Sequence, residues 1–160
     1  MEEKQRQSYR HRTPVQLRFS DVDRFGHVNN AVMFSIYDMA KTEYFNSVLR
    51  ELTKGDTLAV ADICNDASAA LAHSVNLRDL NADFIHPVFY GDKIEIHTAV
   101  ARMGTKSVTV TQQAVNTKTG SVVSTCRTTL VCFSAAKNDS IPVPPEIRKR
   151  ITEYEDNIIL

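Results

Sequence analysis

Hydrophobic and polar residues change their spacing once near the start of the chain. Val15, Leu17 and Phe19 alternate with polar residues, which is the period of a half-buried β-strand. After a polar stretch, apolar residues recur every three or four positions from residue 31 to about residue 48, with charged residues between them. This second period predicts an amphipathic helix over residues 31–48, and asparagines stand where such a helix has its N-terminal cap.

Four later segments have the composition and alternation of β-strands. They are separated by turn residues, and they cover residues 74–85, 92–102, 106–116 and 121–134. Short connections between long strands predict an antiparallel meander. Prolines at 142, 144 and 145, followed by Glu146 and a basic run, predict a short C-terminal helix.

One early helix followed by a run of strands predicts an α+β fold in which the helix packs on one face of the sheet. Residues 1–12 are polar and predict a solvated tail, so that residues 13–160 form a single domain. Residues 49–73 are compatible with either a strand or a helix. A sheet of this kind leaves an edge or a face uncovered, and self-association is the simple way to cover it.

Composition narrows the classes of function. The 160 residues carry 19 basic and 19 acidic side chains, and this balance argues against a nucleic-acid-binding protein. The polar amino terminus and the lack of an apolar run of about 20 residues predict a cytoplasmic protein that does not span a membrane. Three cysteines in such a chain predict reduced, buried thiols, and the spacing of the histidines predicts no metal site.

The candidate chemistry lies in the loop before the predicted helix. Asp21 and Asp23 precede the helix start, where unpaired N–H groups carry a partial positive charge. Such a site stabilises an oxygen that becomes negative during a reaction, for example the carbonyl oxygen of a thioester under attack. A carboxylate beside it is ionised at neutral pH and can act as a base or as a nucleophile. The loop therefore has the groups needed for acyl transfer.

The same stretch resembles a known signature. The run DVDRFGHVNN, from Asp21 to Asn30, looks like the motif of the hotdog-fold thioesterases of the hydroxybenzoyl-coenzyme A thioesterase type. The resemblance continues with NADFIHP at residues 81–87, with Gly91-Asp92, and with residues 104–107, and covers roughly residues 13–135. It implies a long central helix wrapped by an antiparallel sheet. It also implies hydrolysis, without a cofactor, of a thioester of coenzyme A or of an acyl carrier protein.

The resemblance also assigns roles to residues. Asp23 would be the catalytic carboxylate, as nucleophile or as base, and the backbone N–H of Asn30 would hold the thioester oxygen. The residues implied to bind the substrate are Gly26 and His27 in the loop, Asn29 at the helix start, and Lys106 and Ser107 at the phosphate-contact positions. Asp21 is expected to be structural. The family site is built from two subunits, which implies a homodimer or a homotetramer.

Two other functions fit the same fold. One is a hotdog hydratase or dehydratase, which needs a histidine and an acidic residue placed differently. The other is a non-catalytic module that binds acyl thioesters, and it would share the fold and the site at the helix start.

Overall fold

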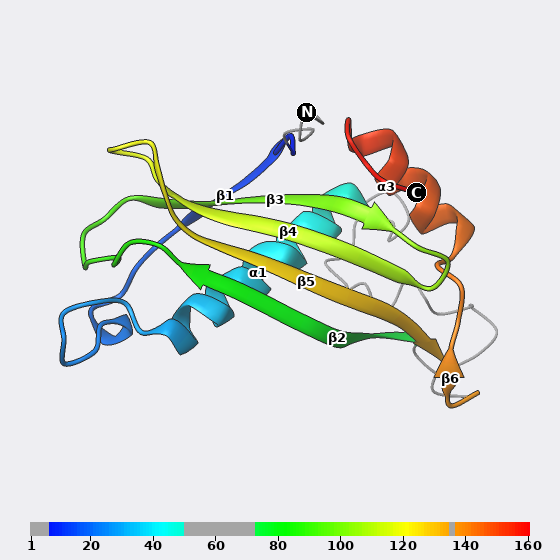
Figure 1. Cartoon of the computed structure of the whole chain (residues 1–160), viewed down its shortest axis with the longest axis horizontal. Coiled ribbons are helices and arrows are strands. Elements are labelled where there is room, and N and C mark those ends of the chain that lie inside the picture. Colours follow the sequence, from blue (N-terminus) through cyan, green and yellow to red (C-terminus); the bar gives the residue numbers. More distant parts are fainter. Residues whose placement is uncertain (1–6, 50–72, 135–136) are drawn as a thin grey trace, which may run out of the picture.

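The computed structural model describes residues 7–49, 73–134 and 137–160 of the chain. The sequence is compatible with either a strand or a helix over residues 49–73. Of this segment, which contains Cys64, only Leu49 and His73 are among the described residues. Figure 1 shows one twisted sheet with a long helix, α1, running across one of its faces. A shorter helix, α3, lies at the opposite end of the sheet from the start of α1. The α+β hotdog fold predicted from the sequence is confirmed.

The strands form a single antiparallel sheet in the order β1-β3-β4-β5-β2, and β6 pairs with the far end of β5. Their bounds are His11–Val15 for β1, His73–Phe84 for β2, Ile94–Met103 for β3, Ser107–Asn116 for β4, Ser121–Ser134 for β5 and Asp139–Ser140 for β6. The four long strands predicted from the sequence are confirmed to within two residues at each end.

The position of β2 differs from a simple meander. β3, β4 and β5 follow one another as predicted, but β2 pairs along its whole length with β5 and forms one edge of the sheet. The connection from β2 to β3 contains Pro87, which donates no backbone hydrogen bond, and it is too long for a tight hairpin. It therefore carries the chain across to β3 instead of returning it beside β2.

The amino-terminal strand begins earlier than the alternation predicts. His11 and Arg12 pair with Thr98 and His97 of β3, so they belong to the sheet and not to the predicted tail. At the other end, Phe19 starts the 3-10 turn η1 (Phe19–Asp21) and is 82% exposed. The chain turns here because the carboxylate of Asp21 accepts a hydrogen bond from the Arg18 N–H at 2.7 Å, which ends the extended conformation.

Helix α1 spans Asn30–Val48, in agreement with the predicted period. Its buried face packs against the sheet through Met33, Ile36, Tyr37, Ala40, Tyr44 and Phe45. Helix α3, Pro145–Tyr154, confirms the predicted C-terminal helix and buries Ile147 and Ile151, one turn apart, against the end of this core. Within the described residues, neither helix has the length and hydropathy of a membrane span. Cys126 and Cys132 are buried, reduced thiols, as predicted.

Candidate active site

The loop that carries the acidic motif is a tight turn before α1. Val22 and Val28 form an antiparallel bridge, and within it the Asp23 N–H donates to the His27 carbonyl at 2.9 Å. The Gly26 N–H donates to the Asp23 carbonyl at 3.0 Å, and Gly26 has a φ of +82°. A positive φ of this size strains any residue with a side chain, so the turn needs glycine at this position. Gly26 therefore shapes the loop.

Asp21 and Asp23 have different surroundings. Asp21 is buried, and its carboxylate accepts a hydrogen bond from the backbone N–H of Arg18 and lies 3.2 Å from the Arg18 guanidinium. The Asp21 carbonyl also accepts from the Asn29 N–H at 2.9 Å, which joins η1 to the start of α1. These bonds agree with the structural role expected for Asp21.

Asp23 is only half-buried. Its Oδ1 accepts a hydrogen bond from the Phe25 N–H at 2.8 Å, which orients the side chain within the turn. A carboxylate has two oxygens and about four lone-pair sites, so this single bond leaves capacity for water or substrate. Of the two aspartates of the motif, Asp23 is the more exposed.

The start of α1 has one side-chain cap. Asn29 is the N-cap, and its Oδ1 accepts from the Ala31 N–H at 2.8 Å. The sequence predicts caps at both asparagines, but Asn30 is already the first helical residue and its side chain is exposed. Its backbone N–H belongs to the first turn of the helix, where N–H groups have no partner within the helix.

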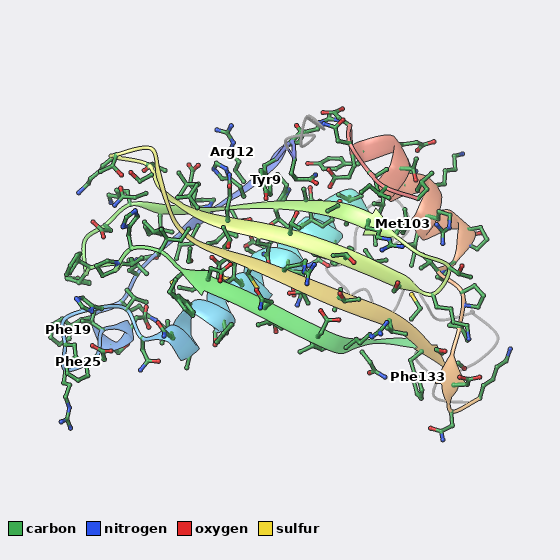
Figure 2. All side chains as sticks on the ribbon, in the orientation of Figure 1. Tyr9, Arg12, Phe19, Phe25, Met103 and Phe133 are labelled. Atoms are coloured by element: carbon green, nitrogen blue, oxygen red, sulfur yellow. The ribbon has the colours of Figure 1, made fainter. Side chains whose placement is uncertain are left out.

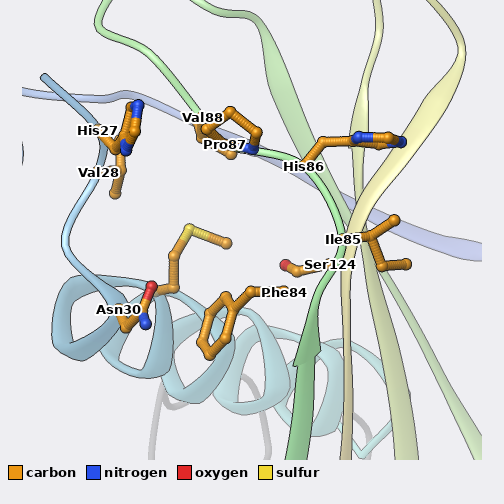
Figure 3. Close-up of a pocket in the computed structure, with 10 residues that line it drawn as sticks. His27, Val28, Asn30, Phe84, Ile85, His86, Pro87, Val88 and Ser124 are labelled. Carbon is orange, nitrogen blue, oxygen red and sulfur yellow. The ribbon is translucent and has the colours of Figure 1, made fainter.

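A cavity of about 170 Å³ opens beside this helix start. Figure 3 shows its walls, which come from the loop before α1, the helix start, the end of β2 with the connection that follows it, and β5. The lining residues are His27, Val28, Asn30, Met33, Phe84, Ile85, His86, Pro87, Val88 and Ser124. A backbone bond from the Val28 N–H to the Val88 carbonyl at 2.8 Å holds the two loops together.

Two of the predicted site residues, His27 and Asn30, line this cavity, while Asp23 and Gly26 lie in the turn directly before it. The ring of His27 packs edge-on against Phe89, with the ring centroids 5.1 Å apart. His27 is therefore held at the wall of the cavity. The structure brings together the part of the predicted site that comes from the acidic motif.

Lys106 and Ser107 lie elsewhere in the same chain. Lys106 lies in the turn that follows Met103, and Ser107 is the first residue of β4, at the end of the sheet opposite Phe19 and Phe25 (Figure 2). The Lys106 ammonium donates to the carbonyl and hydroxyl oxygens of Ser140, at 2.9 and 3.0 Å. Within one chain these residues share no site with Asp23.

Sequence reasoning gave no role to Ser124. It lies on β5 directly opposite Phe84 of β2, and its place in the alternation of β5 is on the side that faces α1. That alternation identifies the side of the sheet, but the sequence contains no signal that this position meets a cavity. Among the described residues, no group of three or more His, Cys, Asp or Glu side chains is arranged to hold a metal ion.

Comparison with known proteins identifies a family. The model of the thioesterase-like superfamily matches residues 17–151. No curated protein matches the chain. Among solved structures, a thioesterase from Thermus thermophilus, complexed with coenzyme A and Zn, is 23% identical, with a TM-score of 0.72 over 91% of this chain and 93% of that chain.

Two further structures share the fold at lower identity. A 1,4-dihydroxy-2-naphthoyl-CoA thioesterase from Synechocystis is 16% identical, with a TM-score of 0.72 over 89% of this chain and 96% of that one. A hypothetical protein from Staphylococcus aureus in complex with CoA is 12% identical, with a TM-score of 0.76 over 96% of this chain and 88% of that one.

Proposed function

Because the chain belongs to the thioesterase-like superfamily, we propose that it hydrolyses an acyl thioester to a free acid and a thiol. The observation that carries this proposal is the start of α1. Asn30 lines the cavity there, and the carboxylate of Asp23 lies in the turn directly before it. An electropositive helix start and an ionised carboxylate are the two groups that attack on a thioester carbonyl requires.

In the proposed mechanism the thioester carbonyl oxygen lies at the first turn of α1. The backbone N–H of Asn30 donates to this oxygen, and the positive end of the helix dipole stabilises the negative charge that develops on it. The cap at Asn29 fixes the direction of this first turn. The side chain of Asn30 has no part in the step.

Asp23 acts either as the nucleophile or as the base. In the first, a carboxylate oxygen attacks the carbonyl carbon, the carbon–sulfur bond breaks, and the thiolate leaves; water then hydrolyses the resulting anhydride and restores Asp23. In the second, the carboxylate takes a proton from a water molecule, whose oxygen attacks the same carbon. The carbon–sulfur bond then breaks, and the leaving thiolate takes the proton from Asp23. Both routes release one acid and one thiol.

We propose coenzyme A as the carrier of the acyl group, with an acyl carrier protein as the alternative. The structures from Thermus and Staphylococcus that share this fold were solved with coenzyme A bound, which supports the first choice. Lys106 and Ser107 remain the proposed contacts for the phosphates. They follow Met103, at the end of the sheet opposite Phe19 and Phe25, which flank Asp23 in the sequence. They therefore contact the same substrate only if a second subunit supplies them.

A homodimer, alone or paired into a homotetramer, is the proposed assembly. β2 forms one open edge of the sheet, and Leu77, Leu80 and Phe84 along it are exposed. The residues opposite them on β5 are buried on the side that faces α1, so this apolar row belongs to the core side of the sheet but lacks cover. A second copy at this edge would cover the row and pair the open backbone.

A cytoplasmic location stays a prediction from the sequence.

The test is a panel of acyl-coenzyme A and acyl-carrier-protein thioesters with a thiol-detecting dye. We expect thiol release by the wild type and a decrease in kcat of about 10²- to 10⁴-fold in Asp23→Asn, which keeps the shape of the side chain and removes its charge. If the wild type binds these thioesters without releasing thiol, the chain is a binding module. If it adds or removes water on the acyl chain instead, it is a hydratase or dehydratase.

A further inference from the structure

The cavity beside the helix start contains one polar group that solvent barely reaches. Asn30 and His86 are exposed, whereas Ser124 is 1% exposed although it lines the cavity. Figure 3 shows its hydroxyl turned toward the interior of the cavity, across from the helix start. Around it, the walls combine polar side chains with the apolar residues Val28, Met33, Phe84, Ile85, Pro87 and Val88. Ser124 therefore lies at the bottom of the cavity, and only a small part of its surface is open to it.

Ser124 is held in place by α1. Its Oγ lies 2.5 Å from the hydroxyl of Tyr37, which is itself 1% exposed. Burial raises the pKa of Tyr37 to about 12, so the phenol stays protonated and neutral. The Tyr37 carbonyl accepts a hydrogen bond from Gln112 Nε2 at 2.9 Å, and the same nitrogen donates to Thr98 Oγ1 at 3.2 Å. The hydroxyl pair is thus anchored to the helix and to the sheet.

The pair can present either a donor or an acceptor to the cavity. Each hydroxyl has one proton and two lone pairs, and one hydrogen bond joins the two. If Tyr37 donates, the proton of Ser124 is available to a carbonyl oxygen. If Ser124 donates, one of its lone pairs is available to a hydroxyl group. The site therefore suits an oxygen-bearing group of either kind.

The volume of the cavity limits what fits beside Ser124. A dry protein cavity of about 150 Å³ accommodates a benzene-sized group, and this one measures about 170 Å³. That space accommodates a short acyl group.

We propose that this cavity is the acyl subsite and that it selects a short acyl group bearing a hydroxyl or carbonyl oxygen, which hydrogen-bonds to Ser124. Tyr37 is the positioning residue, because it holds the Ser124 hydroxyl without lining the cavity. The proposal rests on the proposed thioesterase function and adds the chemical class of the acyl group to it. An alkyl group of equal size fills the same space without making this hydrogen bond. The loss of one neutral hydrogen bond corresponds to a discrimination of about 2- to 10-fold.

The test compares two thioesters that differ by one oxygen, butanoyl-coenzyme A and 3-hydroxybutanoyl-coenzyme A. We expect kcat/KM of the wild type to favour the hydroxylated substrate by about 2- to 10-fold. Ser124→Ala should lower kcat/KM for the hydroxylated substrate alone and so bring the ratio of the two kcat/KM values close to one. Ser124→Thr, which keeps the hydroxyl, should retain the preference. Tyr37→Phe should give an intermediate ratio.

Ser134→Ala is the matched control. Ser134 lies on the same strand and the same side of the sheet, is also 1% exposed, and does not line the cavity. Its substitution should leave the ratio unchanged. A wild type that prefers butanoyl or decanoyl thioesters, or a Ser124→Ala variant that loses activity equally on both short substrates, would overturn the acyl-subsite proposal and leave the thioesterase function standing.

A wild type that releases thiol from no substrate would instead defeat the proposed function. Calorimetry with the non-hydrolysable thioether analogues of the two substrates then decides the subsite separately. Tighter binding of the hydroxylated analogue, lost in Ser124→Ala, supports the subsite. Equal binding of the two analogues, or no binding of either, overturns it.

Discussion

Tyr44 and Glu155 connect the long helix to the end of the C-terminal helix through a buried hydrogen bond. The Tyr44 hydroxyl donates to Glu155 Oε1 at 2.5 Å, and the Val100 N–H donates to the same oxygen at 2.9 Å. Burial raises the pKa of Glu155 above its usual value, while these two donors act in the opposite direction. Burial and the neighbouring carboxylate raise the pKa of Tyr44, which therefore remains a donor.

Tyr44→Phe should therefore lower stability in a pH-dependent way. A raised native pKa means that the stability contributed by the Glu155 carboxyl is present below its unfolded-state pKa and is lost as pH rises through the native value. Removing the Tyr44 donor makes the ionised carboxylate less favourable still. We expect the free energy of unfolding to fall by about 1–3 kcal/mol near neutral pH and by less at about pH 5.

Urea unfolding at the two pH values measures this difference. Tyr90→Phe is the control, because Tyr90 is exposed and its hydroxyl should contribute less than about 0.5 kcal/mol. An equal loss in Tyr44→Phe at both pH values would show that the hydrogen bond does not act through the ionisation of Glu155.

Asp21→Asn should affect folding more than catalysis. The buried carboxylate of Asp21 holds the Arg18 N–H, and replacing one oxygen by an amide nitrogen should cost about 1–2 kcal/mol of stability. Its kcat should fall much less than that of Asp23→Asn, which in turn should keep wild-type stability because Asp23 is only half-buried. Thermal unfolding and thiol release measured on both variants make the comparison. A larger loss of kcat in Asp21→Asn would reverse the two roles.

The two asparagines at the helix start should respond differently to alanine. Asn29→Ala removes the side chain that caps the Ala31 N–H and should cost about 0.5–2 kcal/mol in the free energy of unfolding. Asn30→Ala leaves the backbone N–H in place and removes an exposed side chain, so both stability and kcat should stay close to wild type. A large decrease in kcat in Asn30→Ala would mean that its side chain takes part in the reaction.

Substitutions at the β2 edge should test the assembly. The wild type is expected to sediment as a dimer or a tetramer at micromolar concentration. Leu77→Lys places a charge in the exposed apolar row and should shift the protein toward monomer and lower its activity. Leu160→Lys, at an exposed leucine away from this edge, is the control. A wild type that is monomeric and fully active would contradict the proposed dimer.

Local patterns in the chain were enough to predict the helix over residues 31–48, the four long strands and the loop around Gly26. Each of these depends on residues that are close in sequence, because side-chain period and turn chemistry act over a few positions. The acidic motif also predicted which residues gather at the helix start. The end of β1 was predicted wrongly because the alternation of apolar residues continues to Phe19. In the structure the Asp21 carboxylate accepts a hydrogen bond from the Arg18 N–H, and the chain turns at that point.

The remaining features depend on contacts between distant segments, which no local pattern encodes. β2 pairs with β5 and not with β3, and this pairing places Ser124 opposite Phe84 in the cavity wall. Tyr37 and Ser124 are 87 positions apart, and Tyr44 and Glu155 are 111 apart. Strand order and helix packing bring these polar groups together because a buried hydroxyl or carboxyl is tolerated only with a hydrogen-bond partner. Which partner each one meets is therefore a property of the folded chain.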